Sequence, residues 1–159
     1  MHFQMKVVCD RTMPRKTQKI KLGIFDFTDC EGCQVKLVSL RERLLVLLAR
    51  VDVVNWRLGQ EKGLMDSFNV VLIEGAPVTQ AEVDLLQVLR ERSEFLIGFG
   101  TCATMGGIPA IMDQKDRAKW YQIIYGPGYK PRGLDALPLA SYVQVDFLVH
   151  GCPVDENEI

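Results

Sequence analysis

The sequence predicts an α/β domain with a mainly parallel β-sheet. Short apolar segments alternate with segments in which apolar residues recur every three or four positions, as strands alternate with helices in such domains. The 159 residues suit one domain, and 48% apolar with 25% charged residues is an ordinary balance for a globular core. We place this domain at residues 18–159. Residues 1–17 are expected to form a basic N-terminal arm that is solvated or docks on a partner.

Five strands are expected, of which the first runs from Gln18 to Phe27 and ends at the polar pair Thr28–Asp29. The others are expected at 51–56, 68–73, 95–99 and 143–149. The first helix pattern begins at Cys33 and continues to Val51. A second helix runs to about residue 92, and a short one is expected at 113–121. Polar residues 59–67 read as a connection, and residues 125–138 as a surface loop. The strand order expected for this pattern is 2-1-3-4-5, in a flavodoxin-like, three-layer arrangement.

Charge and hydropathy exclude several classes of function. The formal net charge of −1 gives no reason to expect nucleic acid or an anionic membrane as a partner. No apolar run reaches the roughly 20 residues of a transmembrane segment, and no secretory or twin-arginine signal is recognisable. We therefore expect a cytoplasmic protein, in which the five cysteines are not structural disulfides.

Four of these cysteines follow predicted strands. Cys30 and Cys33 follow the first strand, Cys102 the fourth and Cys152 the fifth, while Glu74 follows the third. The carboxyl ends of parallel strands lie along one edge of an open sheet, where ligands bind. These side chains are therefore expected to converge, and only the second strand is expected to contribute nothing.

Four converging thiolates are the ligand set of a cubane iron–sulfur cluster. Cys30-Glu31-Gly32-Cys33 lies at a predicted helix start, where amide dipoles are expected to moderate the thiolates' charge. Glycines around Cys102 would let backbone amides approach inorganic sulfide. Cys9 lies outside any strand end and reads as a buried packing residue.

Two other chemistries remain open at this point. A Cys-x-x-Cys pair at a strand–helix junction also suits a thioredoxin-like dithiol, which leaves Cys102 and Cys152 unexplained. A four-cysteine zinc site is the second possibility, although zinc ligands usually come as two tight pairs and the second pair here is widely split.

The sequence resembles the small subunits of nickel–iron hydrogenases, which are related to the 20-kDa iron–sulfur subunit of respiratory complex I. Four stretches carry the resemblance, which extends from about Lys19 to the C-terminus. They are Asp29-Cys30-Glu31-Gly32-Cys33, Ile73-Glu74-Gly75-Ala76, Gly98-Phe99-Gly100-Thr101-Cys102-Ala103 and Gly151-Cys152-Pro153.

The resemblance implies that the four cysteines hold the proximal 4Fe–4S cluster, facing a nickel–iron centre in a separate large subunit. Glu74 is similar to the family's acidic residue beside the cluster. For Asp29 the resemblance implies a place near the subunit interface and a part in proton transfer, with a helix N-cap as the alternative. His150 is expected to donate a hydrogen bond to cluster sulfur or to serve as a structural histidine.

Within the family, complex I subunits typically have a tandem Cys-Cys where this sequence has Cys-x-x-Cys, which favours hydrogenase. The absence of cysteines after Cys152 resembles the short, NAD-linked type, which implies an iron–sulfur and flavin subunit of the diaphorase type as a further partner. No residue establishes an FMN site, and no Gly-x-Gly-x-x-Gly fingerprint follows a strand. Three alternatives remain: a subunit of a quinone-linked complex, an independent flavodoxin-like carrier and the dithiol oxidoreductase.

Overall fold

The structure is a computed structural model that describes residues 19–61, 67–111 and 114–159. The predicted N-terminal arm, residues 1–17, and the interpretation of Cys9 as a packing residue lie outside the described residues.

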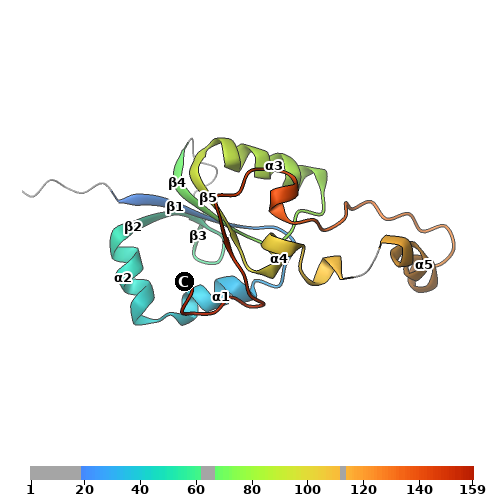
Figure 1. The fold of residues 1–159 in the computed structure, drawn as a ribbon, viewed down its shortest axis with the longest axis horizontal. Helices are drawn as coiled ribbons and strands as arrows, with labels where there is room; N and C mark the ends of the chain where they lie inside the picture. The colour runs from blue at the N-terminus through green and yellow to red at the C-terminus, as the bar shows by residue number, and fades with distance from the viewer. Residues whose placement is uncertain (1–18, 62–66, 112–113) are drawn as a thin grey trace, which may run out of the picture.

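A six-stranded sheet forms the centre of the domain (Figure 1). Its strands in chain order are β1 Ile20–Asp26, β2 Val51–Trp56, β3 Gln60–Glu61, β4 Phe68–Glu74, β5 Ser93–Phe99 and β6 Phe147–Val149. Their spatial order is β3-β2-β1-β4-β5-β6, and every pair except β2–β3 is parallel. Without β3 this order is the predicted 2-1-3-4-5. The antiparallel edge strand β3 was missed because two-residue strands carry no periodicity.

The helices confirm the predicted alternation with two corrections, of which the first is that the short helix at 101–105 was not predicted. The helices are α1 Gly32–Ser39, α2 Glu42–Arg50, α3 Gln80–Glu91, α4 Thr101–Met105 and α5 Gln114–Tyr125, with 3₁₀ turns η1 Ile108–Ala110 and η2 Leu139–Ser141. The single helix expected from Cys33 to Val51 is wrong. It is broken between α1 and α2, where Arg41 has a φ of 52°. The apolar spacing of three and four continues through the break, so periodicity alone did not reveal it.

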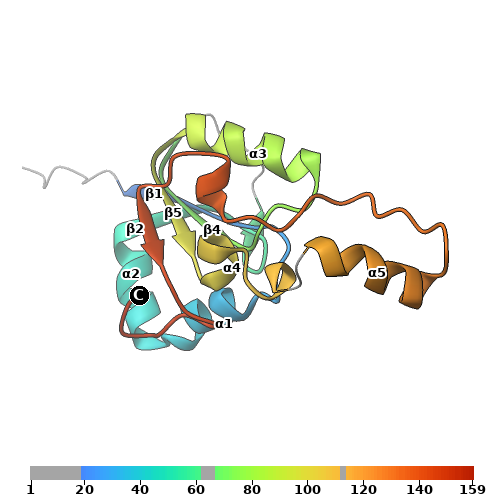
Figure 2. The ribbon, with the colours of Figure 1, turned by 45° about the vertical axis from the view of Figure 1, so that its right-hand side comes forward.

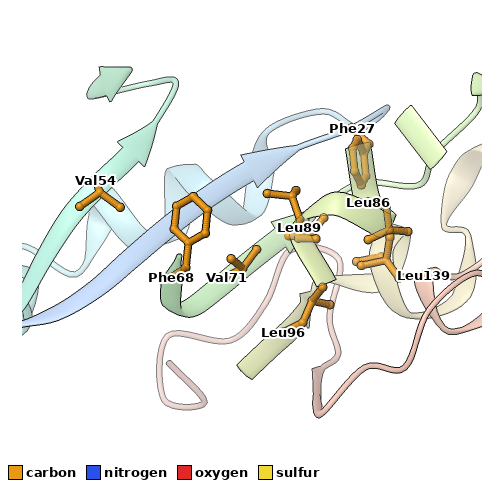
Figure 3. Close-up of a cluster of buried hydrophobic side chains, with 10 residues drawn as sticks. Phe27, Val54, Phe68, Val71, Leu86, Leu89, Leu96 and Leu139 are labelled. Atoms are coloured by element: carbon orange, nitrogen blue, oxygen red, sulfur yellow. The ribbon is translucent and has the colours of Figure 1, made fainter. Parts of the chain in front are cut away.

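Helices cover both faces of the sheet, giving the three layers expected (Figure 1). Helix α3 covers one face, with Leu86 and Leu89 packed on Val71 and Leu96 (Figure 3). Helices α1 and α2 cover the other face, where Leu37 belongs to a cluster with neighbouring strand residues. Val71 and Leu72 belong to different clusters because consecutive strand residues point to opposite faces.

The segment that contains α5 extends away from this body (Figures 1 and 2). It carries Trp120, Ile123 and Ile124 as exposed apolar residues. None of the helices in the described residues is both long enough and apolar enough to cross a membrane.

Candidate functional site

The predicted site residues lie at or just after the carboxyl ends of four parallel strands, at one edge of the sheet. Backbone hydrogen bonds join the loops after β1 and β4: the Phe27 N–H donates to the Glu74 carbonyl at 3.0 Å, and Thr28 and Ala76 exchange two bonds at 3.1 and 3.2 Å. Main-chain contacts therefore fix the Cys30–Cys33 loop against the Glu74 loop, although their residues are far apart in sequence.

The loops after β5 and β6 are joined in the same way. The Gly100 N–H donates to the Val149 carbonyl, and the Thr101 N–H donates to the Gly151 carbonyl, both at 2.8 Å. These two bonds flank Cys102 and Cys152. The protein's own backbone hydrogen bonds thus join the four loops of the site in two pairs.

Cys33 is the most enclosed of the four thiols. Burial raises the pKa of the Cys33 thiol to about 12, and the neighbouring Glu74 and Cys102 contribute to the rise. The Val154 N–H donates a hydrogen bond to its sulfur, which acts in the opposite direction. A cationic metal group is the partner that would favour the thiolate form of such a buried sulfur.

The Cys102 thiol lies close enough to the other three thiols to interact with each of them electrostatically. Burial raises its pKa, and the charges of Asp29, Cys152 and Cys30 contribute, while a hydrogen bond from the Ile108 N–H lowers it. Cys30 and Cys152 are exposed, whereas Cys102 is half-buried. The structure therefore brings the four predicted cysteines into one electrostatic neighbourhood, open to solvent on the side of Cys30 and Cys152.

Two glycines make room for the sulfurs. Gly100 has a φ of +87°, and a β-carbon added there would lie 2.4 Å from the Cys33 sulfur. Gly107 has a φ of +62°, and a β-carbon there would lie 2.4 Å from the Cys102 sulfur. Both positions combine a positive φ with close approach to sulfur, so a side chain is excluded for two separate reasons.

Glu74 is a buried residue at the end of β4, with only 2% of its surface exposed. Its Oε1 accepts the Cys33 N–H at 3.0 Å, and its Oε2 accepts the Gln34 N–H at 2.9 Å. The amides at the start of α1 therefore bind a carboxylate. The expectation that they would moderate the thiolates' charge is wrong for these two amides.

Asp29 lies beside this pair, half-buried. Its Oδ1 accepts the Glu31 N–H at 2.8 Å, while its Oδ2 is buried and has no hydrogen-bond partner among the described residues. Burial raises the pKa of Asp29 to about 6, and the charge of Glu74 adds to this, against the lowering effect of the Glu31 N–H. The N-cap of α1 is Glu31, so the alternative that Asp29 is the N-cap is wrong.

His150 is exposed at the end of β6, and its Nδ1 lies 3.0 Å from the Thr104 hydroxyl oxygen. This bond ties the loop before Cys152 to helix α4, which carries Cys102. It supports the structural alternative for this histidine.

Three residues at this edge were not predicted, and two of them, Trp56 and Arg57, lie at and just after the end of β2, the strand expected to contribute nothing. The Trp56 indole N–H, at the end of β2, donates to Gln34 Oε1 at 2.8 Å. Gln34 is buried, and its Nε2 has no partner among the described residues. Arg57 binds Asp26 at 2.9 Å and Glu31 at 3.6 Å. The only sequence signal for Arg57 was its position directly after a strand.

The donor set fits an iron–sulfur cluster: four thiols, amides on two sulfurs, and glycines where side chains would collide with sulfur. Within the described residues, no three His, Cys, Asp or Glu side chains are grouped closely enough to hold one metal ion. Thiolates around a single zinc lie about 3.8 Å apart, as the Zn–S distance requires. A cluster with an iron at each of four corners holds its thiolates farther apart.

Residues 30–159 match the family model described as the 20 kDa subunit of NADH–ubiquinone oxidoreductase. The chain is 37% identical over 141 residues to subunit delta of sulfhydrogenase 2 from Pyrococcus furiosus, covering 88% of this chain and 59% of that relative. It is 29% identical over 157 residues to subunit delta of the NAD-reducing hydrogenase HoxS from Cupriavidus necator, covering 89% and 75%. The chain spans 52% of the length of a third relative, which belongs to the F420-non-reducing hydrogenase of Methanococcus voltae.

Solved structures share the fold. A chain of an NAD⁺-reducing [NiFe]-hydrogenase in the H₂-reduced state superposes with a TM-score of 0.70 at 25% identity, covering 86% of this chain and 84% of that one. The [NiFeSe] hydrogenase of Desulfovibrio vulgaris Hildenborough gives a TM-score of 0.63 at 15% identity, which shows the fold alone, over 89% of this chain and 57% of the other. Since the family model matches residues 30–159, most of the chain, the chain belongs to the family of the 20 kDa subunit of NADH–ubiquinone oxidoreductase.

Proposed function

We propose that this chain is the electron-transfer small subunit of a nickel–iron hydrogenase. Cys30, Cys33, Cys102 and Cys152 would hold one 4Fe–4S cluster, which relays electrons between a nickel–iron site in a large subunit and a further iron–sulfur or flavin subunit. The related hydrogenase subunits support this assignment, as do the four thiols at one sheet edge.

The observation that carries the proposal is the pair of glycines against the thiols. An added β-carbon at Gly100 or Gly107 would overlap the sulfur of a predicted ligand, Cys33 or Cys102. A dithiol oxidoreductase that uses only Cys30 and Cys33 gives no reason for the second contact. A ligand set drawn from several loops accounts for both.

A bound 4Fe–4S cluster supplies one-electron transfer. The chain's own residues would hold the cluster: the Val154 and Ile108 amides donate to the Cys33 and Cys102 sulfurs, and Cys33 belongs to a buried apolar cluster with Phe99 and Val154. The roles implied for Asp29 in proton transfer and for His150 beside cluster sulfur remain predictions, as does the cytoplasmic location.

The residues that follow Cys102 offer a surface for the large subunit. Met105, Ile108 and Ile111 are exposed apolar residues, the last with 78% of its surface accessible. Large exposed apolar patches mark interaction sites, and obligate interfaces are more apolar than ordinary surface. We place the large-subunit contact on this segment, beside the cysteines, so that electrons cross a short distance.

A quinone-linked, complex I-like subunit is the second candidate, because the matching family model carries that description. The Cys30-x-x-Cys33 spacing and the hydrogenase relatives favour the first proposal. Identification of the subunits that co-purify with the native chain separates the two.

The test is metal analysis and spectroscopy of the anaerobically purified complex. We expect about four irons per copy of this chain beyond those of its partners, with the electron paramagnetic resonance signal of a reduced cubane. Replacing any one of the four cysteines by Ala should remove these irons, whereas Cys9→Ala should retain them. Zinc in place of iron, or a two-iron spectrum, contradicts the proposal.

A further inference from the structure

Glu74 caps a helix to which it does not belong. Helix α1 begins at Gly32, and its N-cap residue Glu31 provides no side-chain hydrogen bond. The first amides of a helix lack partners within the helix. Here the Glu74 carboxylate, at the end of the central strand β4, accepts two of them, from Cys33 and Gln34, with one oxygen each.

This contact fixes the backbone of a predicted cluster ligand. Hydrogen bonds between amides and a carboxylate are about twice as strong as those between neutral groups, and both bonds here are buried. The carboxylate therefore holds the first turn of α1, which carries Cys33, against the end of β4.

No cation neutralises the charge of this carboxylate within the described residues. Within the described residues no ion pair involves Glu74, and Arg57 at the same edge is 66% exposed and binds Asp26 and Glu31. A charge in the interior acts through a lower dielectric constant than one in water. The two amides that bind Glu74 are also unavailable to sulfur, whose hydrogen bonds raise the potential of iron–sulfur clusters.

We propose that Glu74 is a positioning residue that fixes Cys33 and lowers the reduction potential of the cluster through its buried negative charge. This inference rests on the proposed function, because it needs the cluster to be present. Reduction adds one negative charge to the cluster, so a nearby buried carboxylate disfavours the reduced form. The contact with the Cys33 backbone makes the ligand loop rigid at the position where it meets the helix.

The first test compares Glu74→Gln with Glu94→Gln in the complex of this chain with its partner subunits. Each substitution removes one carboxylate charge, but Glu94 is exposed near the start of β5, at the opposite edge of the sheet from the cysteines. Redox titration followed by electron paramagnetic resonance should give a more positive midpoint potential for the cluster in E74Q. The potential in E94Q should equal that of the wild type within error.

The second test addresses the two hydrogen bonds by which Glu74 holds the Cys33 and Gln34 amides, which we call the clamp. It does not depend on E74Q, so it can be carried out even if E74Q does not assemble. Glu74→Asp keeps the charge but shortens the side chain by one methylene, so it cannot hold both amides. We expect an iron chelator to remove the cluster from E74D several-fold faster than from the wild type. A wild-type potential in iron-loaded E74Q overturns the electrostatic role, and a wild-type release rate in E74D overturns the clamp. Iron analysis of the wild type decides the proposed function separately.

Discussion

Gly100→Ala tests whether the missing side chain at Gly100 makes room for the Cys33 sulfur, and the chain contains a matched control for this substitution. In Gly100→Ala the new β-carbon must occupy a position 2.4 Å from the Cys33 sulfur, at a φ of +87°. Gly126 has nearly the same φ, +91°, but nothing lies within 4 Å of its added β-carbon. Comparison of the two variants separates the collision with sulfur from backbone strain.

The magnitudes follow from these two contributions. A positive φ at a residue with a β-carbon costs about 1–3 kcal/mol, and both variants bear a cost of this kind. Overpacking at a buried site adds about 1–3 kcal/mol, and only Gly100→Ala bears that. We therefore expect Gly126→Ala to lose about 1–3 kcal/mol of stability with full iron content, and Gly100→Ala to lose about 2–6 kcal/mol.

Urea unfolding and iron analysis, both carried out on the complex of the chain with its partner subunits, measure the two effects. Gly100→Ala should also lose iron, because Cys33 must move to relieve the contact. The reasoning is refuted if both variants are destabilised equally, or if Gly100→Ala keeps its full iron content.

Three further outcomes are expected. Asp146→Asn should lower stability by about 1 kcal/mol or less, because Asp146 accepts bonds from Arg90 at 2.5 Å and from the Leu96 N–H at 2.7 Å in a partly solvated pair. The hydrogen bond from Arg90, and to a lesser extent that from the Leu96 N–H, lowers the pKa of Asp146. The stabilisation from Asp146 is therefore present above its unfolded pKa of about 4 and disappears as the pH falls through the folded pKa. The urea midpoints of variant and wild type, measured between about pH 3 and 7, should converge in acid. The chain expressed without partners should aggregate or lose iron, and a stable, cluster-loaded monomer would instead indicate an independent carrier. The chain paired only with its large subunit should reduce an artificial dye with hydrogen but not NAD, and NAD reduction by that pair at a comparable rate would reveal a nucleotide or flavin site here.

The positions of the cysteines could be predicted because strand recognition and the rule for parallel sheets were sufficient. Once Cys30, Cys102 and Cys152 were placed after strands, the topology brought them to one edge. The break between α1 and α2 could not be predicted, because it depends on the left-handed backbone of Arg41 and not on apolar spacing.

The surroundings of the ligands were less accessible from sequence than the ligands themselves. Glu74 was expected beside the cluster, but its two bonds to the α1 amides depend on how the β4 and β1 loops meet in space. The Trp56–Gln34 bond likewise joins the end of β2 to α1 through side chains whose residue types alone suggest ordinary packing. Contacts between elements of this kind leave no periodic trace in a sequence.

The pairing of the loops has a consequence for how the site is assembled. Backbone bonds join the loop of Cys30 to that after β4, and the loop of Cys102 to that of Cys152. Each pair of loops keeps its own main-chain bonds without metal, and the β4–β5 ladder already joins the strands that carry the two pairs. A metal group bound by all four cysteines would link the two pairs of loops beyond the ends of these strands. Its removal should loosen the loops relative to each other, while the amides of Thr28 and Ala76 stay protected from hydrogen exchange.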